Sequence, residues 1–130
     1  MPLAYESVRR KVKKRVIYVQ AGETYDHKTL KFWMQAKGMG SKLIVGVVDP
    51  TKNTDMVLNA LATACVDSVV AEAPAKADLM FLEEHDIDYV LSKASQPQFV
   101  TDEVLNTNCS LVVGDDMVVR PLQAKTEHKD

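Results

Sequence analysis

Strand-type and helix-type segments alternate along almost the whole chain, and this alternation is the feature that most restricts the fold. The strand-type segments are short and rich in β-branched residues, and they occupy residues 15–20, 42–48, 66–70, 87–91 and 110–114. The helix-type segments lie between them, at residues 27–39, 54–64, 76–86 and 100–107. This order predicts βαβ units and therefore a parallel sheet.

The segment KLIVGVV, residues 42–48, has no polar residue after its lysine. A strand without alternation of polar and apolar residues is buried on both faces, as in parallel sheets that helices cover on two sides. We therefore predict an α/β fold with a single Rossmann-like, doubly wound parallel sheet of five strands in an α/β/α sandwich. This domain is expected to span residues 15–122, between a basic arm at residues 1–14 and a polar tail at residues 123–130.

Local signals predict the buried side and the ends of the helices. Leu30, Trp33 and Met34, with the stem of Lys37, recur at helical spacing and predict the buried side of the first helix. Thr54 is predicted to be the N-cap of the second helix, because its hydroxyl can accept a hydrogen bond from a free N–H of the first turn.

Composition argues against several classes of protein. A net charge of −2 argues against a dedicated nucleic-acid binder, which is usually strongly basic. No apolar run reaches the roughly 18 residues of a membrane span, and the N-terminus lacks the apolar core of a secretory signal. We therefore expect a soluble protein without a membrane span whose partners are not nucleic acids.

The basic segment SVRRKVKKR, residues 7–15, contains no acidic residue. It is interpreted as a solvated arm, with a docking segment and a residual mitochondrial targeting signal as alternatives. Cys65 and Cys109 lie in or beside apolar runs and in no C-x-x-C spacing, which predicts buried free thiols. Free thiols indicate a reducing compartment, cytoplasmic or mitochondrial. The three histidines are scattered and indicate no zinc site.

Four pieces of the chain are similar to one known family. GSKLIVGVVD resembles the G-D-Y-L-I-V-G-V stretch of the cytidylyltransferase-like nucleotidyltransferases, and VDSVV resembles their V-D-E-V-I. FLEEHDIDYVL resembles their F-L-x-x-H-x-I-D-Y-V, and QAKGMG their x-A-K-x-L-G. The resemblance covers residues 16–91. It implies the nucleotidyltransferase fold, often in a homodimer, and a relationship to enzymes that join CTP to glycerol phosphate, phosphocholine or phosphoethanolamine.

The catalytic signature of that family, H-x-G-H, is degenerate in this chain. Counting back without gaps from LKFWMQAK places the signature on Asp26, His27, Lys28 and Thr29. Only His27 is a histidine, and it occupies the unspecified position. Asp26 is instead predicted to cap the helix, accepting a hydrogen bond from the N–H of Lys28 or Thr29. Those are donors that a phosphate would need, and Glu23 adds a second negative charge.

Other phosphate-handling residues that the resemblance implies are also missing. Met56 and Ala64 stand where the family has arginines, and SKAS replaces the H-G-x-D that follows the fourth strand. The cationic R-T-x-G-x-S-T segment has no counterpart, since VVRPLQAK offers only Arg120 and Lys125. Lys52 remains, near where some members carry a phosphate-binding lysine.

Two further patterns have structural interpretations. GDD at residues 114–116 follows a strand and is interpreted as a turn, because adjacent carboxylates of an extended chain rarely reach one Mg²⁺. Phe32 and Trp33 are interpreted as core residues or as a patch that faces a partner.

The sequence therefore favours a catalytically inactive cytidylyltransferase-like domain that acts as a structural or accessory subunit, without cofactor, in a larger assembly or a homodimer. One alternative is a divergent nucleotidyltransferase that uses CTP with Mg²⁺. A non-catalytic regulator that binds a nucleotide is another. In these alternatives the nucleotide-binding residues are Gly22, Asp26, Lys28, Thr29, Lys52 and Arg120.

Overall fold

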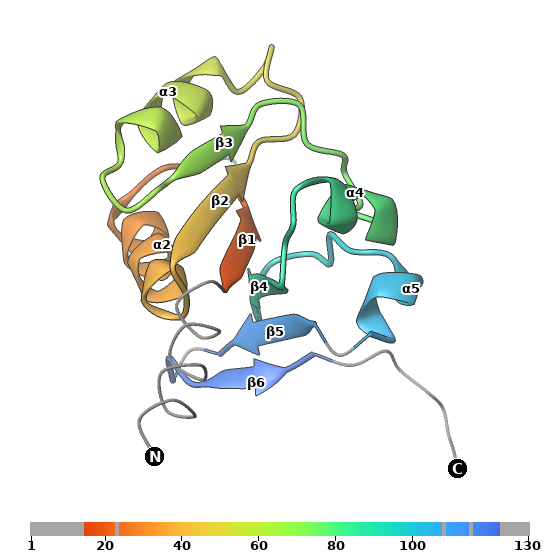
Figure 1. Ribbon diagram of the computed structural model, residues 1–130. Helices are drawn as coiled ribbons and strands as arrows, with labels where there is room; N and C mark the ends of the chain where they lie inside the picture. The colour runs from red at the N-terminus through yellow and green to blue at the C-terminus, as the bar shows by residue number, and fades with distance from the viewer. Residues whose placement is uncertain (1–14, 23, 108, 115, 123–130) are drawn as a thin grey trace, which may run out of the picture.

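The computed structural model describes residues 15–22, 24–107, 109–114 and 116–122. The arm predicted at residues 1–14 and the tail predicted at residues 123–130 lie outside these residues. The strands are β1 (Val16–Gln20), β2 (Lys42–Gly46), β3 (Ser68–Val70), β4 (Tyr89–Lys93), β5 (Ser110–Val113) and β6 (Val119–Pro121). They form one mixed sheet in the order β3-β2-β1-β4-β5-β6, as Figure 1 shows.

Helices cover both faces of this sheet, so the predicted α/β fold with alternating strands and helices is confirmed. The helices are α2 (His27–Gly38), α3 (Thr54–Ala62), α4 (Leu79–Glu84) and α5 (Asp102–Leu105). In Figure 1, α2 and α3 lie on one side of the sheet, and α4 and α5 lie on the other. No helix in the described part of the chain is long and apolar enough to cross a bilayer.

The predicted sheet of five parallel strands is wrong in two respects, because there are six strands and the sixth is antiparallel to β5. The physical reason is the length of the last connection. A parallel crossover needs a dozen or more residues, whereas only residues 114–118 separate β5 from β6. The chain therefore turns back on itself. Asp116 accepts a hydrogen bond from the Val118 N–H at 3.1 Å, which confirms a turn at this point.

The side chains of the central strands alternate between two hydrophobic clusters. Ile17 and Val19 belong to the cluster beneath α2 and α3, while Tyr18 belongs to the cluster beneath α4 and α5. All three are fully buried. The continuous apolar run of β2 has the same cause, because both of its faces are covered, as predicted.

The buried side of α2 differs from the predicted one. Phe32 and Trp33 are buried, which confirms them as core residues, but Met34 is 58% exposed. Because both aromatic side chains turn inward, the next position, about 100° further around the helix, faces away from the sheet. Thr29 and Ala36 complete the buried side.

The predicted cap of α3 is also wrong. Thr54 is the first residue of the helix, and the N-cap is Asn53, which makes no side-chain capping bond. The Asn53 side chain donates instead to the carbonyl oxygen of Val48 at 2.8 Å. The Asn53 side chain therefore stabilises the preceding loop instead of capping the first turn of α3.

The two cysteines are free thiols, as predicted, but both are half-buried rather than buried. Cys65 lies in the connection from α3 to β3, and Cys109 directly precedes β5. Both positions are thus in connections outside the helices and strands. Burial is still sufficient to raise the pKa of the Cys65 thiol.

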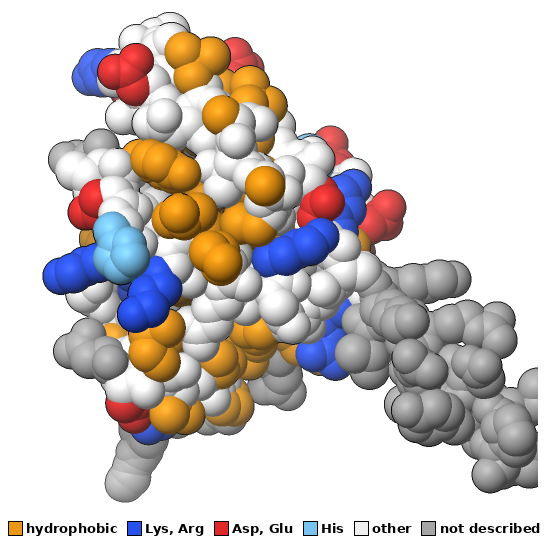
Figure 2. Space-filling model, turned by 90° about the vertical axis from the view of Figure 1, so that its left-hand side faces the viewer, with side chains coloured by type: hydrophobic (Ala, Val, Ile, Leu, Met, Phe, Trp, Pro, Cys, Tyr) orange, Lys and Arg blue, Asp and Glu red, His pale blue; other side chains and the backbone are white. Residues whose placement is uncertain are grey.

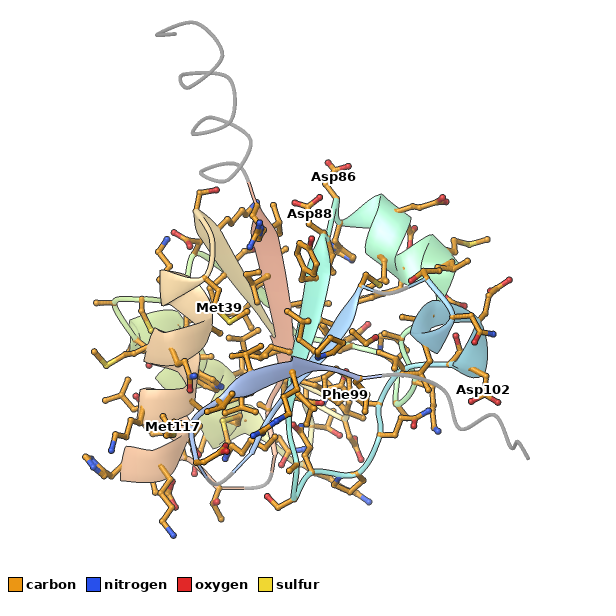
Figure 3. All side chains as sticks on the ribbon, turned by 90° about the horizontal axis from the view of Figure 1, so that it is seen from below. Met39, Asp86, Asp88, Phe99, Asp102 and Met117 are labelled. Carbon is orange, nitrogen blue, oxygen red and sulfur yellow. The ribbon has the colours of Figure 1, made fainter. Side chains whose placement is uncertain are left out.

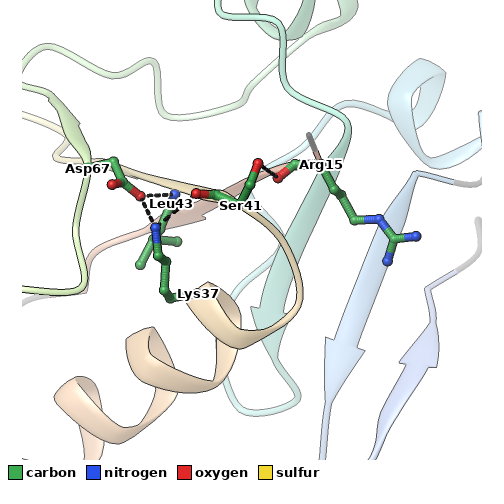
Figure 4. A network of polar contacts seen from close by, with 5 residues as sticks. All are labelled: Arg15, Lys37, Ser41, Leu43 and Asp67. Carbon is green, nitrogen blue, oxygen red and sulfur yellow. Dashed lines mark hydrogen bonds and ion pairs between the residues drawn. The ribbon is translucent and has the colours of Figure 1, made fainter. Parts of the chain in front are cut away.

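A polar network joins α2 to the amino ends of β1, β2 and β3 (Figure 4). Asp67 accepts from Nζ of Lys37 at 2.7 Å and from the buried N–H of Leu43 at 2.8 Å. Nζ of Lys37 also donates to the carbonyl oxygen of Ser41. The Ser41 hydroxyl in turn donates to the carbonyl oxygen of Arg15. Burial alone would raise the pKa of Asp67, but the hydrogen bonds from Lys37 and Leu43 outweigh it and lower that pKa.

Gly46, the last residue of β2, leaves room for a buried tyrosine on the neighbouring strand. The Tyr18 hydroxyl donates to Oε1 of Gln20 at 2.8 Å, and its ring packs edge-on against Phe81 at 5.1 Å between centroids. A Cβ on Gly46 would overlap the Tyr18 hydroxyl oxygen and lie 2.9 Å from Cβ of Ala73. Burial raises the pKa of Tyr18 well above its usual range, so this hydroxyl stays protonated and donating.

Gly46→Ala is expected to lower the free energy of unfolding by about 1–3 kcal/mol, because it overpacks a close-packed core. Gly38→Ala is the matched control, since a Cβ there meets nothing within 4 Å. At this exposed position at the end of α2, that change should stabilise by up to about 1 kcal/mol. Urea unfolding of the three proteins measures both effects. Equal stability of Gly46→Ala and the parent would contradict the close approach of Tyr18.

Candidate functional site

The candidate site lies at the carboxyl ends of β1 and β4. In open parallel sheets, ligands bind beyond the carboxyl ends of the strands, where the strand order reverses. In this sheet the order reverses between β1 and β4, since β2 and β3 lie on one side of β1 and β5 lies beyond β4. The β1–α2 loop and the β4–α5 loop therefore flank the expected crevice.

A side chain of the protein itself bridges this crevice. Nε2 of Gln96 donates to the carbonyl oxygen of Gln20 at 2.9 Å, and Oε1 of Gln96 accepts from the Lys93 N–H at 3.2 Å. The Gln20 side chain is also engaged, because it accepts from Tyr18 and lies 3.4 Å from the carbonyl oxygen of Ala75. Polar groups at the end of β1 thus already have partners within the chain.

The N-terminus of α2 carries a carboxylate as its cap, which confirms the prediction for Asp26. Oδ1 of Asp26 accepts from the Thr29 N–H at 3.0 Å. The Thr29 hydroxyl lies 3.1 Å from the same oxygen and 3.0 Å from the carbonyl oxygen of Thr24, so it can donate to either. These hydrogen bonds from Thr29 lower the pKa of Asp26, and the carboxyl is therefore ionised at neutral pH.

This cap makes the helix end a poor phosphate site. A helix N-terminus attracts anions through its free N–H groups and positive dipole end. Asp26 occupies the Thr29 N–H and brings a negative charge to the same place. A phosphate arriving here would have to displace that carboxylate and would be repelled by it. The predicted second charge, Glu23, lies outside the described residues.

Lysines gather beside this helix end rather than on it. A cavity of about 400 Å³ lies between α2 and the ends of β4 and β5, and three lysines line it: Lys28, Lys31 and Lys93. Nζ of Lys93 lies 5.4 Å from the ring centroid of Phe32, within the range of a cation–π contact. Gln35 also lines this cavity, and its buried Oε1 has no hydrogen-bond partner among the described residues.

A second cavity of about 210 Å³ adjoins the first and shares Phe32, Lys93 and Ser95 with it. Gly22 and Thr29 line this smaller cavity. The structure therefore places Gly22, Lys28 and Thr29 of the predicted nucleotide-binding residues in two adjoining cavities. Asp26, the N-cap of α2, precedes Lys28 and Thr29 directly in the chain.

Lys52 and Arg120 are not part of these two cavities. Lys52 lines a separate cavity between the β1–α2 loop and α3, and its Nζ lies 3.7 Å from Asp49. Nη2 of Arg120 lies 2.7 Å from Oδ2 of Asp116, and this pairing raises the pKa of the guanidinium. Both cations are thus matched by a nearby carboxylate, so the full set of predicted residues does not converge.

Sequence reasoning missed Lys31 and Lys93, although a signal for them was present. Lys28 and Lys31 are three residues apart, which places them on one side of a helix. Lys93 is the last residue of β4, and the carboxyl end of a strand is where ligand-contacting residues occur. Across the residues described, no three His, Cys, Asp or Glu side chains are grouped as a metal site would require.

Comparison with known proteins does not assign the chain to a family. No protein-family model matches the sequence, and no curated protein matches it. The relationship to the cytidylyltransferases therefore stays a proposal that rests on the sequence pieces quoted above.

The Asp26 cap predicts a dependence of stability on pH. The pKa of Asp26 is lower in the folded state than in the unfolded chain. The ionised carboxylate therefore stabilises the fold above the usual Asp pKa of about 3.9, and this stabilisation is lost as the pH falls through the pKa of the folded state. Asp26→Asn keeps a capping oxygen without the charge. The parent should have the higher melting temperature at pH 7, and the difference should shrink below about pH 4. A difference that is constant with pH, measured by thermal unfolding, would contradict an ionised cap.

Proposed function

We propose that this protein is a non-catalytic α/β module of the cytidylyltransferase-like fold that serves as a structural or accessory subunit. The observation that carries the proposal is the Asp26 carboxylate, which holds the Thr29 N–H at 3.0 Å where a phosphate would bind. The order of the strands supports the Rossmann-like part of the proposal, because 3-2-1-4-5-6 is the order of doubly wound nucleotide-binding sheets. The antiparallel β6 departs from that pattern.

The absence of the catalytic histidines argues against nucleotidyl transfer. Phosphoryl-type transfer is catalysed by positioning and by stabilisation of charge, with little covalent chemistry from the protein. Losing one donor of that kind costs about 2.7–4 kcal/mol in the transition state. Asp26 and Thr29 stand at both histidine positions, so two donors are replaced, one of them by an anion.

Exposed apolar surface supports a role in binding another protein. Met34 of α2 is 58% exposed, and Leu58 and Leu61 of α3 are 59% and 63% exposed. Figure 2 shows hydrophobic side chains spread down the middle of this side of the molecule, with Lys, Arg and His side chains beside them. Exposed large apolar side chains on two neighbouring helices are available for contact with another protein. The compartment proposed is the cytoplasm or the mitochondrion.

The test is a pyrophosphate-release assay with CTP or ATP, Mg²⁺ and glycerol phosphate, phosphocholine or phosphoethanolamine. We expect no release above a protein-free control, because the charge-stabilising donors are missing. The native protein is expected to elute in a larger particle or as a dimer when its mass is measured by light scattering. Release that Asp26→Ala abolishes would show a divergent nucleotidyltransferase instead, and a native monomer would contradict the accessory role.

The lysine-lined cavity favours a second candidate function, the binding of a phosphorylated ligand without chemistry. Lys28, Lys31 and Lys93 supply positive charge to one side of a ligand. The buried Oε1 of Gln35 can accept a hydrogen bond from an N–H or O–H of the same ligand. A nucleotide has both features, an anionic phosphate and donor groups on its base and sugar.

Thermal unfolding with CTP, ATP and pyrophosphate tests this second function. Ligand at 100 times its dissociation constant should add about 2.7 kcal/mol of stability. Lys31→Met with Lys93→Met should weaken the binding by about tenfold or more, because hydrogen bonds to charged groups are lost. Lys42→Met is the control and should leave binding unchanged, because Lys42 lies at the amino end of β2, away from the cavity. No stabilisation of the parent by any of the three ligands would exclude this function.

A further inference from the structure

A shallow depression with an apolar floor and an acidic rim lies at the end of the sheet where the parallel strands begin. Its volume is about 360 Å³, and it lies between the end of α4 and the starts of β4 and β5. Leu79, Leu82 and Ile87 form the floor, and Glu83, Asp86 and Asp88 form the rim. Figure 3 shows Asp86 and Asp88 next to one another at this end of the molecule, far from Asp102.

The rim carboxylates have no cation to match them within the described part of the chain. The ion pairs found there use Asp67, Asp49 and Asp116. Arg15 lies at the start of β1, but its guanidinium sits over the ring of Tyr89, 4.9 Å from the centroid. The depression therefore presents net negative charge around an apolar surface, and its complement is a cationic segment with apolar residues.

The described chain begins at this same place. The Val16 N–H donates to Oδ2 of Asp88 at 2.7 Å, and the Asp88 N–H donates to the carbonyl oxygen of Val16 at 2.9 Å. The residues before Val16 therefore start directly beside the acidic rim. These two hydrogen bonds fix Val16 beside Asp88, and the basic arm, residues 1–14, ends two positions earlier in the sequence.

The basic arm has the composition that the depression requires. Five cations fall within six residues, namely Arg9, Arg10, Lys11, Lys13 and Lys14. Val12 lies between them, and Val8 directly precedes the first. A chain spans at most about 3.3–3.6 Å per residue, so Lys13 and Lys14 start within a few residue lengths of Asp88.

We propose that the basic arm docks in cis on this acidic depression, with its lysines and arginines paired to Glu83 and Asp86 and its valines on the apolar floor. Attachment at Val16 favours the arm of the same chain over a separate molecule, because a short tether gives an effective concentration on the order of millimolar. The inference does not depend on the proposed function, since the depression lies at the amino ends of the strands and the candidate site at their carboxyl ends.

Limited trypsin digestion of the full chain tests the proposal, because every cation of the arm is a cleavage site. At low salt the arm should be cut slowly. Glu83→Gln with Asp86→Asn should speed removal of the arm by about twofold or more, since exposed ion pairs are lost. Asparagine is chosen because Asp86 has a φ of 53°, a conformation that asparagine tolerates. Salt near 1 M, where the screening length is about 3 Å, should speed cleavage of the parent likewise.

The matched control is Glu72→Gln with Glu103→Gln, which makes the same change in charge at two exposed residues outside the depression. Its arm should be cut at the parent rate. Thermal unfolding of each variant shows that the domain is still folded. Equal cleavage rates in the parent, the depression variant and the control would overturn the proposal.

Zero-length crosslinking with a carbodiimide distinguishes docking in cis from docking on another molecule. The reagent takes up water as an amide bond forms between a carboxylate and a lysine amine. We expect Lys13 or Lys14 to be joined to Glu83 or Asp86 within one chain. In a mixture of isotopically heavy and light protein, heavy–light crosslinks at these residues would show an arm docked on a second copy and would overturn the proposal.

Discussion

The structure depends on β1, which is the central strand and is buried on both faces. It pairs with β2 along its whole length, from Val16 opposite Lys42 to Gln20 opposite Gly46, and with β4 on its other edge. Side chains from the flanks of β4 hold both of its ends. Asp88 binds the N–H of Val16 at the amino end, and Gln96 binds the carbonyl oxygen of Gln20 at the carboxyl end. Because the strand order reverses between β1 and β4, the Gln96 contact lies in the crevice at the carboxyl end, and the Asp88 contact fixes the opposite end of the strand.

At the carboxyl end, this arrangement has a chemical consequence. The loop after β1 delivers Asp26 to the start of α2, where a carboxylate stabilises the helix by accepting a free N–H. The same group reduces the attraction of that helix end for phosphate. Positive charge lies to one side instead, on Lys28, Lys31 and Lys93. The fold thus has a crevice where the strand order reverses, with its positive charge beside the helix end rather than on it.

The sheet differs in charge between the carboxyl ends and the amino ends of its parallel strands. Lysines line the cavity of about 400 Å³ at the carboxyl ends of the strands. Carboxylates from the end of α4 and the α4–β4 connection line the depression at the amino ends. The acidic group is visible along the sequence, since Glu83, Asp86 and Asp88 fall within six residues. The lysine group is not, because Lys93 comes from a separate segment. Lys93 joins Lys28 and Lys31 only because β4 lies beside β1. Asp88 meets the start of β1 for the same reason.

The sequence by itself determined the order in which the first five strands and the four helices follow one another along the chain. It also determined the cap of α2 by Asp26. These features are local, since they follow from periodicity and from residues a few positions apart. The tertiary structure decided the rest of the fold. It added β6 as an antiparallel strand, turned Met34 outward when Phe32 and Trp33 turned inward, and separated Lys52 and Arg120 from the cavities. The outward Met34 and the separated cations depend on packing between distant segments, whose energy no local pattern of residues records. The direction of β6 follows from its short connection, but only the pairing with β5 shows that residues 119–121 form a strand.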